Sequence, residues 1–346
     1  MLQRLAPPKR DHALLFTHIP KCAGSTFRNR LLLEFTRIHR APRDFACVLY
    51  RDVSFRERPI NSTLARQGPA CLGPDGYFRR RLLVITGHVS FHPSVLSRVG
   101  APSFAAVVFV REPLSRLVSL FNMYPDGTWG PPSDNSSSPA QRFAETYRRR
   151  FEGRNALTCF IAGSSLCDSV GALSRAAISP ASLRRARFNL VHRFDVVGLT
   201  ERAAESMAII SWAFGWLPAW KQLQQAKLEA GQEAAGGGDK SLSALFGRER
   251  LAPGSQHRRL TREDLCAIPG LLDHMRKEEA PDVELYRLAQ AVYTQRLPLV
   301  PAEVLALGAT AETDAKEPAC WADPRRQTHV ACDIEEEEAR SSLLAP

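Results

Sequence analysis

The chain has 346 residues, of which 44% are hydrophobic, so it can bury a substantial core as one large domain or as one domain with appendages. Its formal net charge is +10, but residues from Ala302 onward carry −6, which leaves +16 on the preceding body. A basic body suits a polyanionic partner, whereas nothing resembles a zinc finger, an RNP motif or regularly spaced aromatics, so no nucleic-acid partner is predicted. The sequence has no CxxC pair and no HExxH helix, and we therefore predict no metal site.

The first predicted element is a strand over residues 13–18, which leads through a Pro-Lys turn into a helix expected from Ser25 to about Arg37. Backbone N–H groups at such a helix N-terminus favour an anion, and Lys21 adds a positive charge. The Walker pattern is absent, because the lysine precedes the small residues instead of following the second glycine. The loop is therefore predicted to bind a phosphate group other than that of an ordinary nucleoside triphosphate, through Lys21 and the backbone of Cys22, Ala23, Gly24, Ser25 and Thr26.

Two further apolar strands each end in a residue suited to chemistry. The strand over 82–86 leads to His88, whose imidazole is a candidate general base near neutral pH. Its rivals are His12, His18 and His92, of which His18 is expected to lie close to the phosphate loop. The strand over 105–110 ends at Arg111 and is followed by a helix from Pro113 to about Asn122. Arg111 can bind a second phosphate with its planar fork, and Ser119, two turns along that helix, can donate a hydroxyl hydrogen bond to it.

The remaining pattern alternates strands and helices, which predicts an α/β fold with a central parallel sheet. We expect a surface loop over 124–139, a strand over 194–199, a helix from Thr200 and a flexible hinge over 234–239. Residues 254–261 form either a basic lid or a plain loop, and helices are expected over 261–267 and 271–295. The predicted domain spans residues 11–300, and the acidic segment 301–346 is expected to be a disordered tail.

Together the loop and the arginine-serine pair resemble a known family. Pro-Lys-x-x-Gly-Ser-Thr resembles the 5′-phosphosulfate loop of sulfotransferases that use 3′-phosphoadenosine 5′-phosphosulfate (PAPS), and Arg111 with Ser119 resembles their 3′-phosphate motif. This implies a P-loop-like sulfotransferase fold with the sheet flanked by helices. Residues 87–91, 185–191 and 194–201 narrow the resemblance to the uronyl and heparan sulfate 2-O-sulfotransferases, over roughly residues 12–295.

The resemblance implies an activity: sulfuryl transfer from PAPS to a glycan hydroxyl, with uronic acid 2-O as the favoured acceptor position. Lys21 then contacts the 5′-phosphosulfate, Arg111 and Ser119 hold the 3′-phosphate, and His88 is the base. The chain departs from the 2-O enzymes at Thr86, where they have a second histidine, and at His18, where an arginine is expected. Galactose or hexosamine acceptors remain alternatives, as do a non-catalytic glycosaminoglycan-binding homologue and a nucleotide kinase.

The resemblance also implies surroundings for the enzyme. It points to an anionic polysaccharide partner, to a possible homo-oligomer and to the Golgi lumen, with membrane attachment only through an anchor that this chain lacks. No run of eighteen apolar residues and no signal-peptide region before Asp11 is present, so a soluble or truncated form is also expected. Cys159 and Cys167 lie near a short disulfide loop of the 2-O enzymes, and the alternative is a pair of reduced core thiols.

Overall fold

A parallel β-sheet forms the centre of the computed structural model, which describes residues 12–24, 27, 46–50, 66–67, 84–88, 91, 103–123, 138–150, 154–163, 178–215 and 260–309. Its strands are β1 (His12–Thr17), β2 (Ala46–Tyr50), β3 (Arg66–Gln67), β4 (Val84–His88), β5 (Ser103–Val110) and β6 (Val196–Leu199). Their order is β3-β2-β4-β1-β5-β6, and every neighbouring pair is parallel. The predicted α/β class with a central parallel sheet flanked by helices is confirmed.

Strand β1 lies inside the sheet because its side chains are apolar on both faces. Leu14, Leu15 and Phe16 are all buried, as expected for a parallel strand covered on both sides. Thr17, its last residue, pairs with Gly87 of β4 and with Val108 of β5. The segments that follow β4, β1 and β5 therefore leave the sheet at one edge, which is where ligands bind in open α/β sheets.

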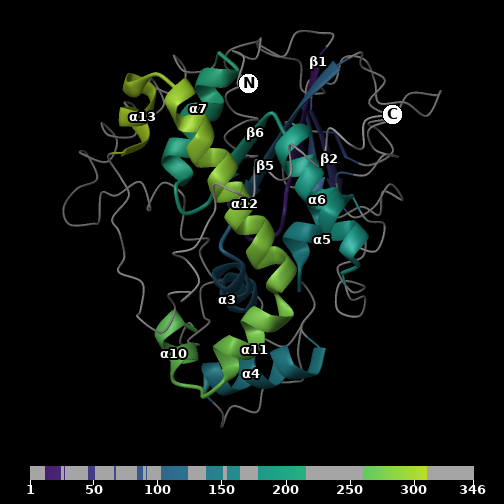
Figure 1. Cartoon of the computed structure of the whole chain (residues 1–346), viewed down its shortest axis with the longest axis vertical. Coiled ribbons are helices and arrows are strands. Elements are labelled where there is room, and N and C mark those ends of the chain that lie inside the picture. The colour runs from purple at the N-terminus through teal and green to yellow at the C-terminus, as the bar shows by residue number, and fades with distance from the viewer. Residues whose placement is uncertain are drawn as a thin grey trace.

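Helices cover the sheet and extend beyond its carboxyl edge (Figure 1). In chain order they are α3 (Pro113–Met123), α4 (Pro139–Arg150), α5 (Ala156–Ala162), α6 (Pro180–His192), α7 (Ala203–Ala213), α10 (Arg262–Cys266), α11 (Leu271–Glu278), α12 (Ala280–Arg296), the 3-10 turn η3 (Leu297–Leu299) and α13 (Ala302–Ala309). The long helix α12 packs against α5, α6 and β6 and also contacts α3.

Two apolar clusters form the core of the described residues. The larger surrounds the sheet and includes residues of β1, β5, α5, α7 and α12. The smaller joins α3 to α4, α10 and α11, and its centre includes Leu117, Phe143, Leu265 and Met275. In Figure 1, α4, α10 and α11 lie at the lower end, and α3 lies between them and the sheet. Helix α3 therefore connects the sheet edge to a helical layer.

Most predicted elements within the described residues are present at shifted boundaries. One prediction was wrong: the helix expected over 271–295 is two helices, α11 and α12, which meet at Glu279. Beyond the boundary expected at residue 300, the structure describes α13, and Val304 of this helix is buried in the larger cluster. The rest of the proposed tail and the helix expected over 25–37 lie outside the described residues, apart from Phe27.

Within the described part of the chain, none of the helices combines the length and the apolar character needed to cross a membrane.

Candidate functional site

The loop after β1 is held in a tight, partly left-handed conformation. Lys21 has φ 67° and Ala23 has φ 54°, values that residues other than glycine seldom adopt. The Cys22 N–H donates to the Ile19 carbonyl oxygen over 3.2 Å, and the Phe27 N–H donates to the Ala23 oxygen over 3.0 Å, which closes a first helical turn. Such strained backbone persists only where its surroundings enforce it, and it is concentrated at ligand sites. Left-handed residues at a helix start also direct backbone N–H groups into an anion-binding concavity.

This geometry changes the role expected of Cys22. Its N–H is used within the turn, so we no longer expect it to reach a phosphate. The N–H groups of Ala23 and Gly24 follow it in the described loop, and those of Ser25 and Thr26 lie outside the described residues. The Cys22 thiol is fully buried, and burial raises its pKa to about 12 even though Arg116 and Arg111 oppose the rise. The thiol therefore stays protonated, in agreement with the structural role predicted for it.

Gly24 is required by the close approach of His18. A Cβ atom at Gly24 would lie 1.7 Å from Cδ2 of the His18 ring, so no larger residue fits without moving that ring. His18 is 3% exposed, and its ring stacks on Phe16 with 5.9 Å between the centroids. Its backbone N–H donates to the Gly87 carbonyl oxygen over 2.9 Å. The His18 ring therefore packs against the loop at Gly24, and its backbone joins the loop to the end of β4.

Arg111 connects the two predicted half-sites. Its Nη1 donates to the Lys21 carbonyl oxygen over 3.3 Å, although the two residues are 90 positions apart in the chain. The contact follows from the sheet, because β5 lies directly beside β1 and Arg111 comes directly after β5. A guanidinium and the lysine loop therefore lie at one point of the carboxyl edge.

The beginning of α3 is occupied by its own carboxylate. Glu112 accepts from the N–H groups of Leu114 over 3.0 Å and of Ser115 over 2.7 Å, which caps the helix. The Ser115 hydroxyl donates to Glu112 over 2.6 Å and accepts from Arg262 of α10 over 2.7 Å. An anion at this site is therefore expected beside Arg111 and not on the α3 N-terminus. Ser119 is half-buried, one turn beyond Ser115 on the same side of the helix.

A cluster of buried charges joins α3 to the α11–α12 junction. The sequence did not predict this cluster. Burial raises the pKa of both Glu279 and Asp282. The charge of Arg116, which is 0% exposed, opposes that rise. Asp282 accepts from the N–H groups of Leu157 over 2.9 Å and Thr158 over 2.7 Å, at the start of α5.

The second carboxylate of this cluster binds the residue before α5. Glu279 accepts from the Asn155 N–H over 2.8 Å and from the Tyr147 hydroxyl over 3.2 Å. Asn155 is in the left-handed region at φ 51° and makes no side-chain cap of its own. The α11–α12 junction therefore caps α5 from more than 120 positions away. The sequence carries only one signal for this, a pair of acids at the start of a long helix.

Some predicted site residues are described only by their backbone or not at all. His88 ends β4, opposite Tyr50 of β2 and next to Gly87, so its backbone lies at the same edge as the loop and Arg111. Its side chain lies outside what the structure describes, as do Ser25 and Thr26. Of its rivals, His18 lies beneath the loop as described above, and His92 falls outside the described residues.

Two cysteines among the described residues are oxidised. Cys159 of α5 and Cys266 of α10 are each disulfide-bonded. The alternative of a reduced thiol at Cys159 is therefore wrong. Cys167, its expected partner, lies outside the described residues. Disulfides of this kind persist in oxidising compartments.

The described residues contain no group of three or more histidine, cysteine or acidic side chains that could hold a metal ion. They do bring two basic residues to one sheet edge. Lys21 belongs to the left-handed loop, and the Arg111 guanidinium contacts the backbone of that loop.

Comparison with known proteins agrees with the resemblance to sulfotransferases noted in the sequence. Residues 8–126 match the sequence model of a family described as the sulfotransferase family. The match includes the loop after β1, the end of β4 and the whole of the Arg111–Ser119 segment. A search of curated proteins found no match to the chain. The family match supports an enzyme that transfers sulfate, on the α/β fold described above.

Proposed function

We propose that this chain is a PAPS-dependent carbohydrate sulfotransferase whose favoured acceptor is the 2-hydroxyl of a uronic acid in a glycosaminoglycan-like chain. The observation that carries the proposal is the contact between Arg111 and the Lys21 backbone, because it brings together two segments that we predict to bind phosphate and that lie 90 residues apart. Both segments also fall inside the stretch that matches the sulfotransferase family.

PAPS, when bound, supplies an activated sulfuryl group, and the residues of the chain bind and orient it. Lys21 and the N–H groups after Cys22 face the 5′-phosphosulfate, where they stabilise the negative charge that builds on the leaving phosphate. Arg111 and Ser119 hold the 3′-phosphate. The buried ring of His18 keeps the loop in its left-handed shape, so these donors are preorganised before the donor substrate arrives.

The proposed reaction forms one sulfur–oxygen bond and breaks another. The acceptor hydroxyl oxygen attacks the sulfur, the bond between sulfur and the 5′-phosphate oxygen breaks, and adenosine 3′,5′-bisphosphate leaves. His88 takes the hydroxyl proton. Its backbone at the end of β4 lies beside the loop, which supports this role through position alone. Loss of such a base should lower the rate by ~10²- to 10⁴-fold.

We extend the proposal to the compartment. The disulfides at Cys159 and Cys266 support an oxidising environment, and the Golgi lumen is the compartment in which such enzymes meet their acceptors. The basic body of the chain suits an anionic polysaccharide there.

The test is a transfer assay with labelled PAPS and desulfated heparan, chondroitin and dermatan chains. Wild type should label at least one acceptor, and both Lys21→Ala and His88→Ala should abolish most of the label. Arg276→Gln, on α11 and outside the proposed site, is the matched control and should retain activity. Disaccharide analysis of the product identifies the hydroxyl.

The outcomes separate the alternatives. Binding of adenosine 3′,5′-bisphosphate without transfer to any acceptor would favour a non-catalytic homologue. Label on galactose or hexosamine would correct the acceptor but keep the reaction. No binding of the bisphosphate would refute the proposal.

A further inference from the structure

Helix α6 presents a basic, acid-free face to solvent. Residues 180–193 contain four arginines and no acidic residue. Arg187 is half-buried and pairs with Glu284 of α12 over 2.8 Å, which fixes the inner side of the helix. Arg184, Arg185 and Arg193 are exposed, and no acidic partner for them occurs among the described residues. Within the described part of the chain, the positive charge of this face is therefore not compensated.

An aromatic side chain lies within the same face. Phe188 is 36% exposed, one of two large apolar side chains among the described residues with that much exposure. The guanidinium of Arg193 lies 5.8 Å from its ring centre, and the His192 ring lies 4.9 Å from it. Arg184, Phe188 and His192 are spaced four residues apart, so they follow one stripe along the helix.

The stripe begins near the carboxyl edge of the sheet. Residues 193–195 connect α6 to β6, and β6 is parallel to β5, so α6 runs antiparallel to the strands. Its first turns, with Arg184 and Arg185, therefore lie toward the edge that carries Arg111 and the end of β4.

Helix α6 is also on the His88 side of that edge. Phe91, three residues after His88, donates its N–H to the Phe160 carbonyl oxygen of α5 over 2.8 Å. Its ring lies 4.6 Å from the ring of Phe194, just past α6. Figure 1 shows α5 and α6 side by side, with α3 on the other side of α12 in this view. The segment that follows β4 therefore packs on the side of the sheet that α5 and α6 cover.

We propose that the exposed face of α6, formed by Arg184, Arg185, Phe188 and Arg193, is a docking surface for a linear anionic polysaccharide. This inference rests on the proposed function, because the polysaccharide is the acceptor chain, held here away from the hydroxyl that reacts. Carboxylate and sulfate groups would pair with the arginines, and the apolar face of a sugar ring would pack on Phe188.

Other polyanions fit the face less well. Oxidised Cys159 and Cys266 favour a compartment in which glycans, and not nucleic acids, are the abundant polyanions. A membrane-surface helix needs a broad apolar face beside its basic one, whereas α6 exposes one large apolar side chain.

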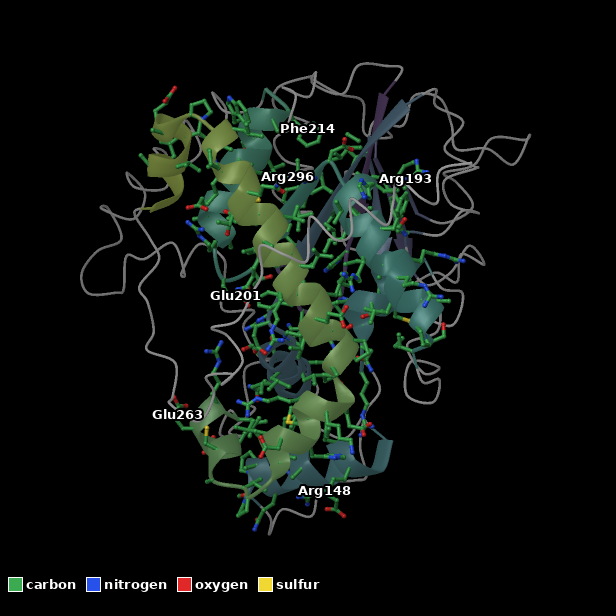
Figure 2. All side chains as sticks on the ribbon, viewed as in Figure 1. Arg148, Arg193, Glu201, Phe214, Glu263 and Arg296 are labelled. Atoms are coloured by element: carbon green, nitrogen blue, oxygen red, sulfur yellow. The ribbon has the colours of Figure 1, made fainter. Side chains whose placement is uncertain are left out.

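The test compares two variants with equal loss of charge. Arg184→Gln/Arg185→Gln changes the α6 face, while Arg148→Gln/Lys277→Gln removes two exposed charges from α4 and α11. Arg148 is labelled at the lower end of Figure 2, away from Arg193. Binding of desulfated, carboxylate-bearing heparan chains is measured at several salt concentrations, together with transfer onto long chains and onto a short oligosaccharide acceptor. Unchanged thermal midpoints would show that both variants fold.

We expect the α6 variant to bind the long chain about 30-fold more weakly, with a shallower salt dependence, and the control to lose little. KM for the long chain should rise while kcat and turnover of the short acceptor stay near wild type. Equal losses in the two variants, or unchanged binding in the α6 variant, would overturn the inference. A loss of binding to RNA or to anionic vesicles without loss of polysaccharide binding would also overturn it. Polysaccharide binding needs no turnover, so an inactive wild type with an intact α6 effect would refute only the proposed reaction.

Discussion

Single residues determine the shape of the loop after β1. Gly24 is present because the His18 ring occupies the space that any Cβ would need, and His18 is in turn held by Phe16 and by the Gly87 carbonyl oxygen. The loop conformation thus depends on a buried histidine that need not contact the substrate. His18 is a positioning residue in this view, and the departure from the expected arginine has a structural reason.

We expect Gly24→Ala to lower the transfer rate by ~10²-fold, because the added methyl must displace either the His18 ring or the loop donors. His18→Ala/Gly24→Ala makes room for the methyl and should recover part of that loss. The measurements are transfer rate and affinity for adenosine 3′,5′-bisphosphate. A double variant no better than Gly24→Ala would show that His18 is not the obstruction.

The Cys22 thiol should be unreactive in the folded protein, because it is fully buried and its pKa is raised to about 12. Alkylation at pH 8 followed by peptide mapping should leave Cys22 unmodified until denaturant is added. The same maps without reductant should show Cys159 and Cys266 in disulfides. Rapid native modification of Cys22 would contradict its buried position.

At the scale of elements, the α11–α12 junction carries an electrostatic cost. Two carboxylates are buried there with one guanidinium, and they serve as the cap that α5 lacks. Burial raises the pKa of Glu279 from 4.5 to about 8, with the charge of Asp282 adding to the rise. The folded protein therefore holds a proton that the unfolded chain releases at lower pH.

This difference predicts how stability varies with pH. Between about pH 4.5 and pH 8 the folded state binds more protons than the unfolded state at Glu279, so its contribution to the free energy of unfolding falls as pH rises. The slope from one such group is at most about 1.4 kcal/mol per pH unit. Glu279→Gln should flatten the decline, and denaturant unfolding at several pH values measures it.

Glu278→Gln is the matched control for that series. Glu278 directly precedes Glu279 in the chain. Its carboxylate pairs with Arg154 over 2.8 Å and does not cap α5. The control should keep the wild-type slope. Equal flattening in both variants would assign the effect to net charge instead of to the buried junction.

Sequence patterns predicted the elements whose causes are local. Continuous apolar runs gave β4 and β5, and Pro113 after Arg111 gave the start of α3. The break at Glu279 was missed because its reason lies elsewhere: the carboxylate turns toward Asn155, and no periodicity within residues 271–296 requires it. Likewise, the pattern predicted Arg111 as a phosphate ligand, whereas its contact with the Lys21 carbonyl depends on β5 lying next to β1.

The whole molecule combines a sheet that carries the site with a helical layer joined to it through α3. Asn122 near the end of α3 exchanges two hydrogen bonds with the backbone of Leu260, and Arg262 bonds Ser115 near its start. The segment that enters α10 is thus fixed along the length of the proposed 3′-phosphate helix. The proposed docking face belongs to α6, which packs with α5 and α12 and not with this helical layer.

The place of β1 in the sheet also governs how the nascent chain can acquire its site. This strand is made before both of its neighbours, β4 and β5, which follow much later in the chain. Until they emerge, the apolar strand lacks the two strands that flank it, and the carboxylates that cap α5 arrive later still. Such long-range pairing makes folding slow and leaves apolar segments exposed on the way. Synthesis of this protein should therefore depend on chaperones until residues near 282 have emerged.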